Sequence, residues 1–393
     1  MLFPTYEFLG FFFLVFGIGI FLKQQVTAYK YFLVLASLVF YSFWSLKFLS
    51  LLVIDTIINY IILQSITRSQ HKNFFFTLGL VINLLYLVFF KYENFFVDSL
   101  FEFLHLIHLQ SHFQVLQIIA PVGISFYTFR IIAHLVDCYK NQLDCPPLLD
   151  YAVYVTYFPQ IASGPIARAQ EFYVQLNSRE KYNYKIEYVI ILIISGLFKK
   201  YTLSSFLFNF TQLPFSLPEQ YSSFDLILAA VAYSCLIYVD FSGYSDLANA
   251  ISSLLGFKPI PNFNMPYRSL SVQEFWRRWH ISLSEWLRDY LYIPLGGNRK
   301  GQLRKYLNLM LTMVIGGFWH GAGVNFLIWG GLHGVGLIIN HLWKDLGKII
   351  SAKNTIREEK EKNFSFREDK KNVFAELDGH SLRKSLENPH IYF

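Results

Sequence analysis

The chain has 393 residues, of which 54% are hydrophobic and 16% are charged. A soluble globular domain carries about 25% charged residues, so this composition excludes an ordinary soluble domain. Aromatic residues reach 19% and the mean hydropathy is +0.34, which indicates one membrane domain over most of the length. The formal charge of +7 follows from the Lys and Arg that cytoplasmic loops collect, and we expect no nucleic-acid partner.

The first apolar run, residues 8–22, predicts a retained transmembrane helix. No basic segment precedes it and no small-residue cleavage site follows it, as a signal peptide would require. A crossing takes roughly 20 apolar residues, and we expect roughly eight to eleven crossings in all. Some runs are short or interrupted by Gly and Pro, so re-entrant and interfacial helices are expected among them. The clearest runs cover residues 8–22, 31–46, 48–65, 73–90, 115–135, 187–198, 226–241, 305–319 and 324–343.

The basic loops predict the orientation. Lys23 and Lys30 lie in one short loop, and Arg68 and Lys72 lie in another, two crossings later. Both loops therefore face the same side, which the positive-inside rule makes the cytoplasm, with the N-terminus outside. The loop 297–305 is the most basic short connection and is expected on the cytoplasmic side as well.

Two interruptions are expected inside the membrane domain. Residues 157–166 (YFPQIASGPI) place Pro and Gly where a crossing helix would not tolerate them, which predicts a re-entrant elbow. Asp240 and Asp246 flank residues 241–245 at the end of an apolar run, which favours a helix break that lines a cavity. The three cysteines form no CxxC pair and are expected to be packing residues.

Residues 271–290 (SVQEFWRRWHISLSEWLRDY) carry the pattern of one amphipathic helix. Ser271 and Glu274 form a capping box at its start, and Glu274 is placed to pair with Arg277 or Arg278. One face of this helix, at the i, i+3, i+4, i+7 spacing, holds Trp276, Trp279, His280, Leu283, Trp286, Leu287 and Tyr290.

His280 lies on the tryptophan face of that helix, away from the charges. An interfacial helix with Trp on its buried side and basic residues on its polar side accounts for every residue except this imidazole. Two readings stay open: a buried histidine with a hydrogen-bonding partner, or a residue of a functional site.

His320 ends an apolar run inside residues 316–321 (GGFWHG). The small residues on both sides permit close approach of backbone or substrate, and we expect a break at Gly316 and Gly317. A neutral imidazole in an apolar setting is a competent general base. A histidine that bonds a free carbonyl at a helix break is the alternative. His333, in residues 329–334 (WGGLHG), repeats the pattern in mid-span and is expected to serve helix packing.

Several chemistries lack their motifs. The chain contains no GxSxG elbow, HExxH pair, Walker A loop or dinucleotide fingerprint. No second ligand stands three or four residues from His280, His320 or His333, so we expect no metal site.

Beyond about Lys344 the chain turns polar, with runs such as EEKEK at residues 358–362. This predicts a membrane-embedded part, 1–343, and a charged tail, 344–393, that is a solvated helix or disordered.

Residues 275–297 (FWRRWHISLSEWLRDYLYIPLGG) and 317–322 (GFWHGA) together resemble the membrane-bound O-acyltransferase (MBOAT) family. The DYLYIPLGG continuation is similar to the bacterial alginate O-acetyltransferase branch rather than the branch that transfers D-alanine to teichoic acid. Residues 7–9, the elbow, and residues 262–267 (NFNMPY) also resemble that branch. The likeness extends from near the start to about His333, where relatives continue with further transmembrane helices.

This resemblance implies an all-α polytopic fold around a transmembrane tunnel, in a bacterial inner membrane. It implies His320 as the catalytic residue at the constriction and His280 as a second histidine of the site. It further implies a cytoplasmic thioester donor such as acetyl-CoA, with no tightly bound cofactor. The acceptor is a polysaccharide or cell-wall glycan outside, reached through an SGNH-hydrolase-like partner.

The functional hypothesis is direct acyl transfer, with His320 taking the proton of an acceptor hydroxyl. We place Trp276, Trp279 and Trp319 along the tunnel. Arg288 and Asp289 are placed there too, where pairing with neighbouring groups to fix the helix is expected to outweigh a direct role. The alternatives are a transporter or flippase for a polar or lipid-linked substrate, D-alanyl transfer to teichoic acid, and a catalytically inactive scaffold.

Overall fold

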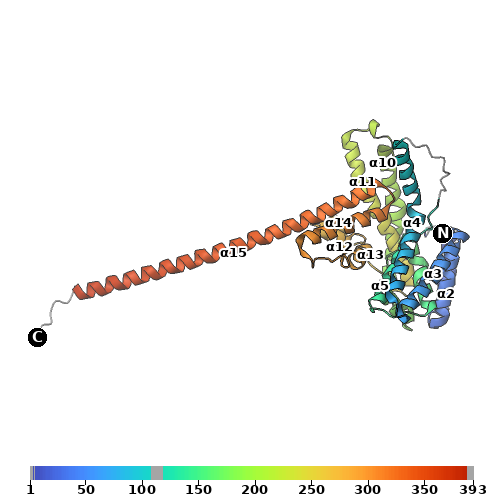
Figure 1. Cartoon of the computed structure of the whole chain (residues 1–393), viewed down its shortest axis with the longest axis horizontal. Coiled ribbons are helices and arrows are strands. Elements are labelled where there is room, and N and C mark those ends of the chain that lie inside the picture. Colours follow the sequence, from blue (N-terminus) through green and yellow to red (C-terminus); the bar gives the residue numbers. More distant parts are fainter. Residues whose placement is uncertain (1–2, 4, 108–117, 387–393) are drawn as a thin grey trace. The chain divides into compact units, whose positions relative to one another are not determined.

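The computed structural model describes residues 3, 5–107 and 118–386, so residues 115–117 of one predicted span lie outside it. The chain divides into two compact units, Met1–Gly334 and Val335–Phe393. Every regular element in the described residues is helical (Figure 1). The charged tail is helical as far as Leu386.

The N-terminal helices are α1 (Tyr6–Leu22), α2 (Val26–Ser42), α3 (Leu46–Arg68), α4 (Lys72–Leu106), α5 (Ile124–Tyr139), α6 (Leu148–Thr156), α7 (Phe158–Ile161) and α8 (Ala169–Asn177). Next come α9 (Ile186–Leu197), the π-helical turn η1 (Phe198–Leu203), α10 (Ser204–Ser216), the 3₁₀ turn η2 (Pro218–Gln220) and α11 (Ser223–Leu254). The remaining elements are the 3₁₀ turn η3 (Pro266–Arg268), α12 (Val272–Arg278), α13 (Ile281–Leu287), the π-helical turn η4 (Arg288–Tyr292), α14 (Gly301–His320) and α15 (Val324–Leu386).

The structure confirms the all-α polytopic fold. Five helical stretches of the described chain are long and apolar enough to cross a membrane: Leu46–Arg68, Lys72–Leu106, Ile186–Ser216, Ser223–Leu254 and Val324–Glu359. The shorter apolar helices α1 and α2 add to them. The other predicted spans lie in α5 and α14, which are shorter or carry more polar residues.

Two helical stretches continue past the ends of their predicted spans and carry charged residues that pair with each other. α9, η1 and α10 form one stretch beside α11 (Figure 1). Between these two stretches Lys199 pairs with Asp246 at 2.7 Å, and Lys200 pairs with Asp240 at 2.6 Å. α11 therefore runs unbroken through both carboxylates. The predicted break at Asp240 and Asp246 is wrong, since paired charges cost a helix far less than isolated ones.

The predicted elbow is present. α6 ends at Thr156, the four-residue α7 follows, and the chain leaves helical structure after Ile161. Arg130 of α5, which is 1% exposed, holds this elbow: it donates to the main-chain oxygen of Tyr154 at 2.9 Å and to the side chain of Gln160. The elbow therefore packs into the main core rather than standing at the surface.

The single amphipathic helix predicted over 271–290 is wrong, because the structure divides it at Trp279 and His280. The break exists because residues 262–264 take the backbone hydrogen bonds: the Ile281 N–H donates to the Asn262 oxygen at 2.8 Å, and the Asn264 N–H donates to the Arg278 oxygen at 2.9 Å. The predicted capping box is present in part, because the Glu274 carboxylate accepts from the Leu270 N–H at 3.0 Å and not from that of Ser271. Ser271 Oγ accepts from the Glu274 N–H at 3.2 Å, and Glu274 pairs with Arg278 at 2.7 Å.

Candidate active site

His320 is the last residue of α14, and the helix ends at Gly321. The expected break at Gly316 and Gly317 is wrong, because α14 runs through both glycines. Their role is close packing: a Cβ on Gly317 would lie 2.4 Å from the Phe326 oxygen and 2.8 Å from the Gly330 Cα. Contact between two backbones leaves no room for a side chain, so the α14–α15 crossing depends on glycine.

An aromatic cage surrounds His320. Its ring lies 4.9 Å from the ring of Trp319 and 5.1 Å from the ring of Trp329, both edge to face. Trp329 in turn lies 4.6 Å from His333, and His333 lies 5.1 Å from Trp276. Trp276 and Trp319 are buried while His320 is exposed. The structure thus brings Trp276, Trp319 and His320 together and leaves the imidazole accessible.

His280 is buried between α11 and α14, with 1% of its surface exposed. Its backbone has φ 40°, a left-handed conformation that is uncommon outside glycine. The ring lies 4.7 Å from Phe241 and 6.3 Å from Trp319. Burial lowers the pKa of His280 well below its ordinary value, and His320 lowers it further, so the ring is neutral at pH 7.

Both ring nitrogens of His280 lack a hydrogen-bonding partner within the described chain, as do the indole N–H groups of Trp276 and Trp319. Buried polar atoms without partners are rare in folded proteins. These three residues are linked by ring contacts to the cage, and their ring nitrogens are available to a polar ligand. The same observation argues against the reading of His280 as a histidine satisfied by protein.

Trp279 belongs to a neighbouring cluster. Its ring lies 5.2 Å from Phe263, 5.4 Å from Phe275 and 6.1 Å from Tyr238. The structure gives it no ring contact with His320, and the tunnel-lining role assigned to it remains a prediction. The reason is the break at His280, which turns Trp279 toward α11.

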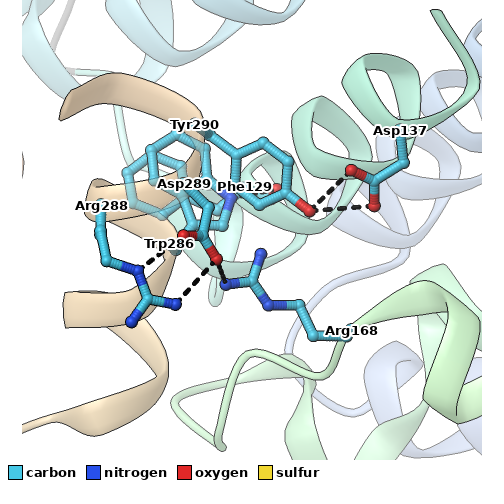
Figure 2. Close-up of polar contacts among 7 residues, drawn as sticks. All are labelled: Phe129, Asp137, Arg168, Trp286, Arg288, Asp289 and Tyr290. Atoms are coloured by element: carbon cyan, nitrogen blue, oxygen red, sulfur yellow. Dashed lines mark hydrogen bonds and ion pairs between the residues drawn. The ribbon is translucent and has the colours of Figure 1, made fainter. Parts of the chain in front are cut away.

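Arg288 and Asp289 take part in a polar clasp that Figure 2 shows. Asp289 accepts from Arg168 at 2.5 Å and from Arg288 at 2.7 and 3.2 Å, while the Tyr290 hydroxyl donates to Asp137 at 2.9 Å. The clasp ties η4 to α5 and to the segment after the elbow. These contacts are the pairing that the sequence predicts for the two residues, and their tunnel role stays a prediction.

A stack of rings connects this clasp to the histidine. The Phe129 ring stacks on two indole rings. Its centre lies 3.9 Å from that of Trp286, with 5° between the ring planes, and 5.1 Å from that of Trp319, with 19° between the planes. The Trp286 indole also donates to the Phe129 oxygen at 2.8 Å. The clasp and the stack therefore hold Trp319, the residue beside His320, in place.

The clasp leads to a testable difference between its two acidic–basic contacts. Asp289→Asn should lower the melting temperature measurably, because it removes the partner of half-buried Arg168. Arg288→Gln should leave it within about a degree, since the Arg288 side chain is 57% exposed and exposed ion pairs contribute little. Thermal unfolding of the two purified variants measures this. Because Asp289→Asn removes both contacts, equal losses in the two variants would show that the half-buried Arg168 pair adds no stability beyond the exposed one.

Sequence reasoning missed Lys91 and Tyr92 of α4, which contact the last turn of α14. The Tyr92 hydroxyl donates to the Phe318 oxygen at 2.9 Å, and the Lys91 ammonium donates to the Trp319 oxygen. Lys91 also donates to Ser125 Oγ at 3.2 Å. The signal in the sequence is a lone lysine directly after the predicted span 73–90, a position where a charge inside the membrane points to function.

The fold and site define a polytopic helical membrane protein with an exposed histidine bordered by an aromatic cage. The family model of the membrane-bound O-acyltransferases matches residues 21–359. The chain belongs to the membrane-bound O-acyltransferase family, as its histidine motifs predict.

Comparison with individual relatives narrows the family assignment to a branch. The chain is 40% identical over 345 residues to a peptidoglycan O-acetyltransferase of Helicobacter pylori, covering 80% of this chain and 64% of that one. It is 40% identical over 362 residues to a probable alginate O-acetylase of Azotobacter vinelandii, covering 91% and 71%. A teichoic acid D-alanyltransferase of Streptococcus thermophilus is 31% identical over 256 residues, covering 61% and 60%. The predicted similarity to the O-acetylating branch is confirmed, and the chain spans about two thirds of these relatives' length.

Proposed function

We propose that this protein is an O-acyltransferase that moves an acyl group, in the simplest case acetyl, from a cytoplasmic thioester to a hydroxyl of an extracytoplasmic polysaccharide or cell-wall glycan. Family membership and the names of the O-acetylating relatives support it. The single observation that carries it is the accessible imidazole of His320 between buried Trp319 and half-buried Trp329. That setting suits a general base that must meet a substrate away from water.

The reaction assigns a step to His320. The acceptor hydroxyl oxygen attacks the thioester carbonyl carbon while its proton passes to His320. The C–S bond then breaks, and the thiolate takes the proton back, so that ester and free thiol are the products. The rings of Trp319 and Trp329 keep bulk water from the thioester. His280 contributes a second neutral imidazole, with its ring 6.3 Å from the ring of Trp319.

The donor is acetyl-CoA, used as a substrate and not held as a cofactor. It enters from the cytoplasm, where the basic loop 297–305 can attract its phosphates. A tunnel lined by the cage carries the acyl group toward the outer side. Residues 1–343 form the membrane-embedded acyltransferase domain and residues 344–393 form a polar, charged tail.

The acceptor side requires a partner in this proposal. An SGNH-hydrolase-like protein outside the bacterial inner membrane passes the acyl group to the glycan. Relatives named for peptidoglycan and for alginate O-acetylation support a glycan acceptor. The D-alanyl alternative has weaker support, because the relatives named for it match a smaller share of the chain at lower identity.

The test is an acyl-transfer assay. Purified protein in lipid vesicles, given acetyl-CoA labelled in the acetyl group, is expected to release free thiol and to label an added glycan or partner, with slow thioester hydrolysis when no acceptor is present. The intramembrane pairs Lys199–Asp246 and Lys200–Asp240 are the observation that favours a transporter. Transport of a substrate by folded protein without any thioester turnover would overturn the proposed function.

A further inference from the structure

Lys91 places a positive charge inside a membrane helix. It stands within α4, in a stretch long and apolar enough to span the bilayer. A charged side chain at such depth is costly and usually has a partner or a function. None of the ion pairs found in the described part of the chain includes Lys91. Its charge is therefore not explained by a carboxylate.

The ammonium has a hydrogen-bond donor to spare. It carries three N–H groups, and its acceptors in the described chain are the Trp319 oxygen and Ser125 Oγ. It also lies 5.0 Å from the centre of the Trp319 ring, which in turn is 4.9 Å from the His320 ring. One N–H thus remains for an oxygen atom bound beside His320.

The C-terminus of α14 is a place where the positive charge of Lys91 has a stabilising effect. A helix carries partial negative charge at its C-terminus, where the last carbonyl groups point outward. His320 lies at that end, so an oxyanion formed beside it would be repelled by the helix. Lys91 and Tyr92 cover the carbonyls of Trp319 and Phe318. Of these two residues, only Lys91 brings a full positive charge that offsets the repulsion.

We propose that Lys91 stabilises the oxyanion of the acyl-transfer reaction, an inference that rests on the proposed function. When the acceptor oxygen bonds to the thioester carbonyl carbon, the carbonyl electron pair moves onto oxygen. That oxygen accepts a hydrogen bond from the free N–H of Lys91. When the C–S bond breaks, the pair returns to the carbonyl and the oxyanion disappears. Lys91 keeps its proton throughout and is a catalytic residue in the sense that it touches the reacting oxygen.

Tyr92 separates this role from simple capping of the helix. Both residues bond a carbonyl of the same turn, but the Tyr92 hydroxyl is neutral and its bond to Phe318 is complete. If α4 only caps α14, removing either contact should have the same effect. If the charge stabilises an oxyanion, Lys91 alone should govern the chemical step.

The experiment compares Lys91→Met, Lys91→Arg and Tyr92→Phe with the wild-type protein in vesicles, using labelled acetyl-CoA. Loss of one oxyanion donor lowers kcat about 100- to 1000-fold. We expect that loss in Lys91→Met, with KM for acetyl-CoA within about threefold because the ground state does not need the charge. Lys91→Arg should retain a tenth or more of the wild-type kcat, and Tyr92→Phe should stay within about threefold.

Two further readouts decide the result. A phosphonate analogue of the tetrahedral intermediate, titrated calorimetrically, should bind the wild type at least tenfold more tightly than Lys91→Met, and melting temperatures report folding. If Lys91→Met and Tyr92→Phe lose kcat and melting temperature equally, Lys91 only caps α14 and the proposal is wrong. Equal phosphonate binding would also overturn the proposal. A folded wild type without thioester turnover instead defeats the proposed function itself.

Discussion

His320→Ala should lower acyl-transfer turnover about 100- to 10,000-fold, the range that a general base contributes. The imidazole takes the proton of the attacking hydroxyl, and alanine offers no replacement. Folding should be little affected, because the His320 side chain is exposed and its ring contacts are with Trp319 and Trp329. The measurement is the initial rate of label transfer from acetyl-CoA, with the melting temperature recorded beside it.

His71→Ala is the matched control, since His71 is an exposed histidine just before α4 and outside the cage. It should keep wild-type turnover. If His320→Ala retains more than a tenth of the wild-type rate, another residue is the general base. His280→Ala would then be the variant to compare. Loss of turnover together with a large drop in melting temperature would make His320 a structural residue.

Gly330→Ala should destabilise the membrane domain strongly. A Cβ at this position would lie 2.4 Å from the Met313 oxygen and 3.0 Å from the Val314 Cα, both backbone atoms of α14. Overpacking costs about 1–3 kcal/mol, and backbone atoms cannot rotate away, so the upper part of that range is expected. The two helices would separate near His320, and turnover should fall with stability. Thermal unfolding in detergent and the acyl-transfer rate measure the two effects.

The neighbouring glycine provides the control. A Cβ on Gly331 would meet nothing within 4 Å, and alanine favours a helix over glycine by up to about 1 kcal/mol. Gly331→Ala should therefore match or exceed the wild-type melting temperature. If both variants unfolded at the same temperature, close packing at Gly330 would not be what holds α14 against α15.

Much of the architecture is visible in the sequence because lipid imposes simple rules on a chain. The apolar runs predict the membrane helices, and Pro159 and Gly164, close together in a short run, predict the elbow because each weakens a helix. The histidine motifs predict the family and point to His280 and His320. Each of these conclusions depends on residue type and on spacing along one segment, which the sequence contains in full.

Other features depend on contacts between distant segments, and the tertiary structure alone decides them. The break at His280 exists because the main-chain oxygen of Asn262 accepts a hydrogen bond from the Ile281 N–H. No pattern within residues 271–290 predicts this contact. α11 stays whole because lysines from η1 reach Asp240 and Asp246. Lys91 becomes a candidate catalytic residue only through the Trp319 carbonyl, more than two hundred residues away. Local sequence determined the helices and the histidines, whereas long-range packing determined which polar groups share the site, because hydrogen bonds and charges act across space.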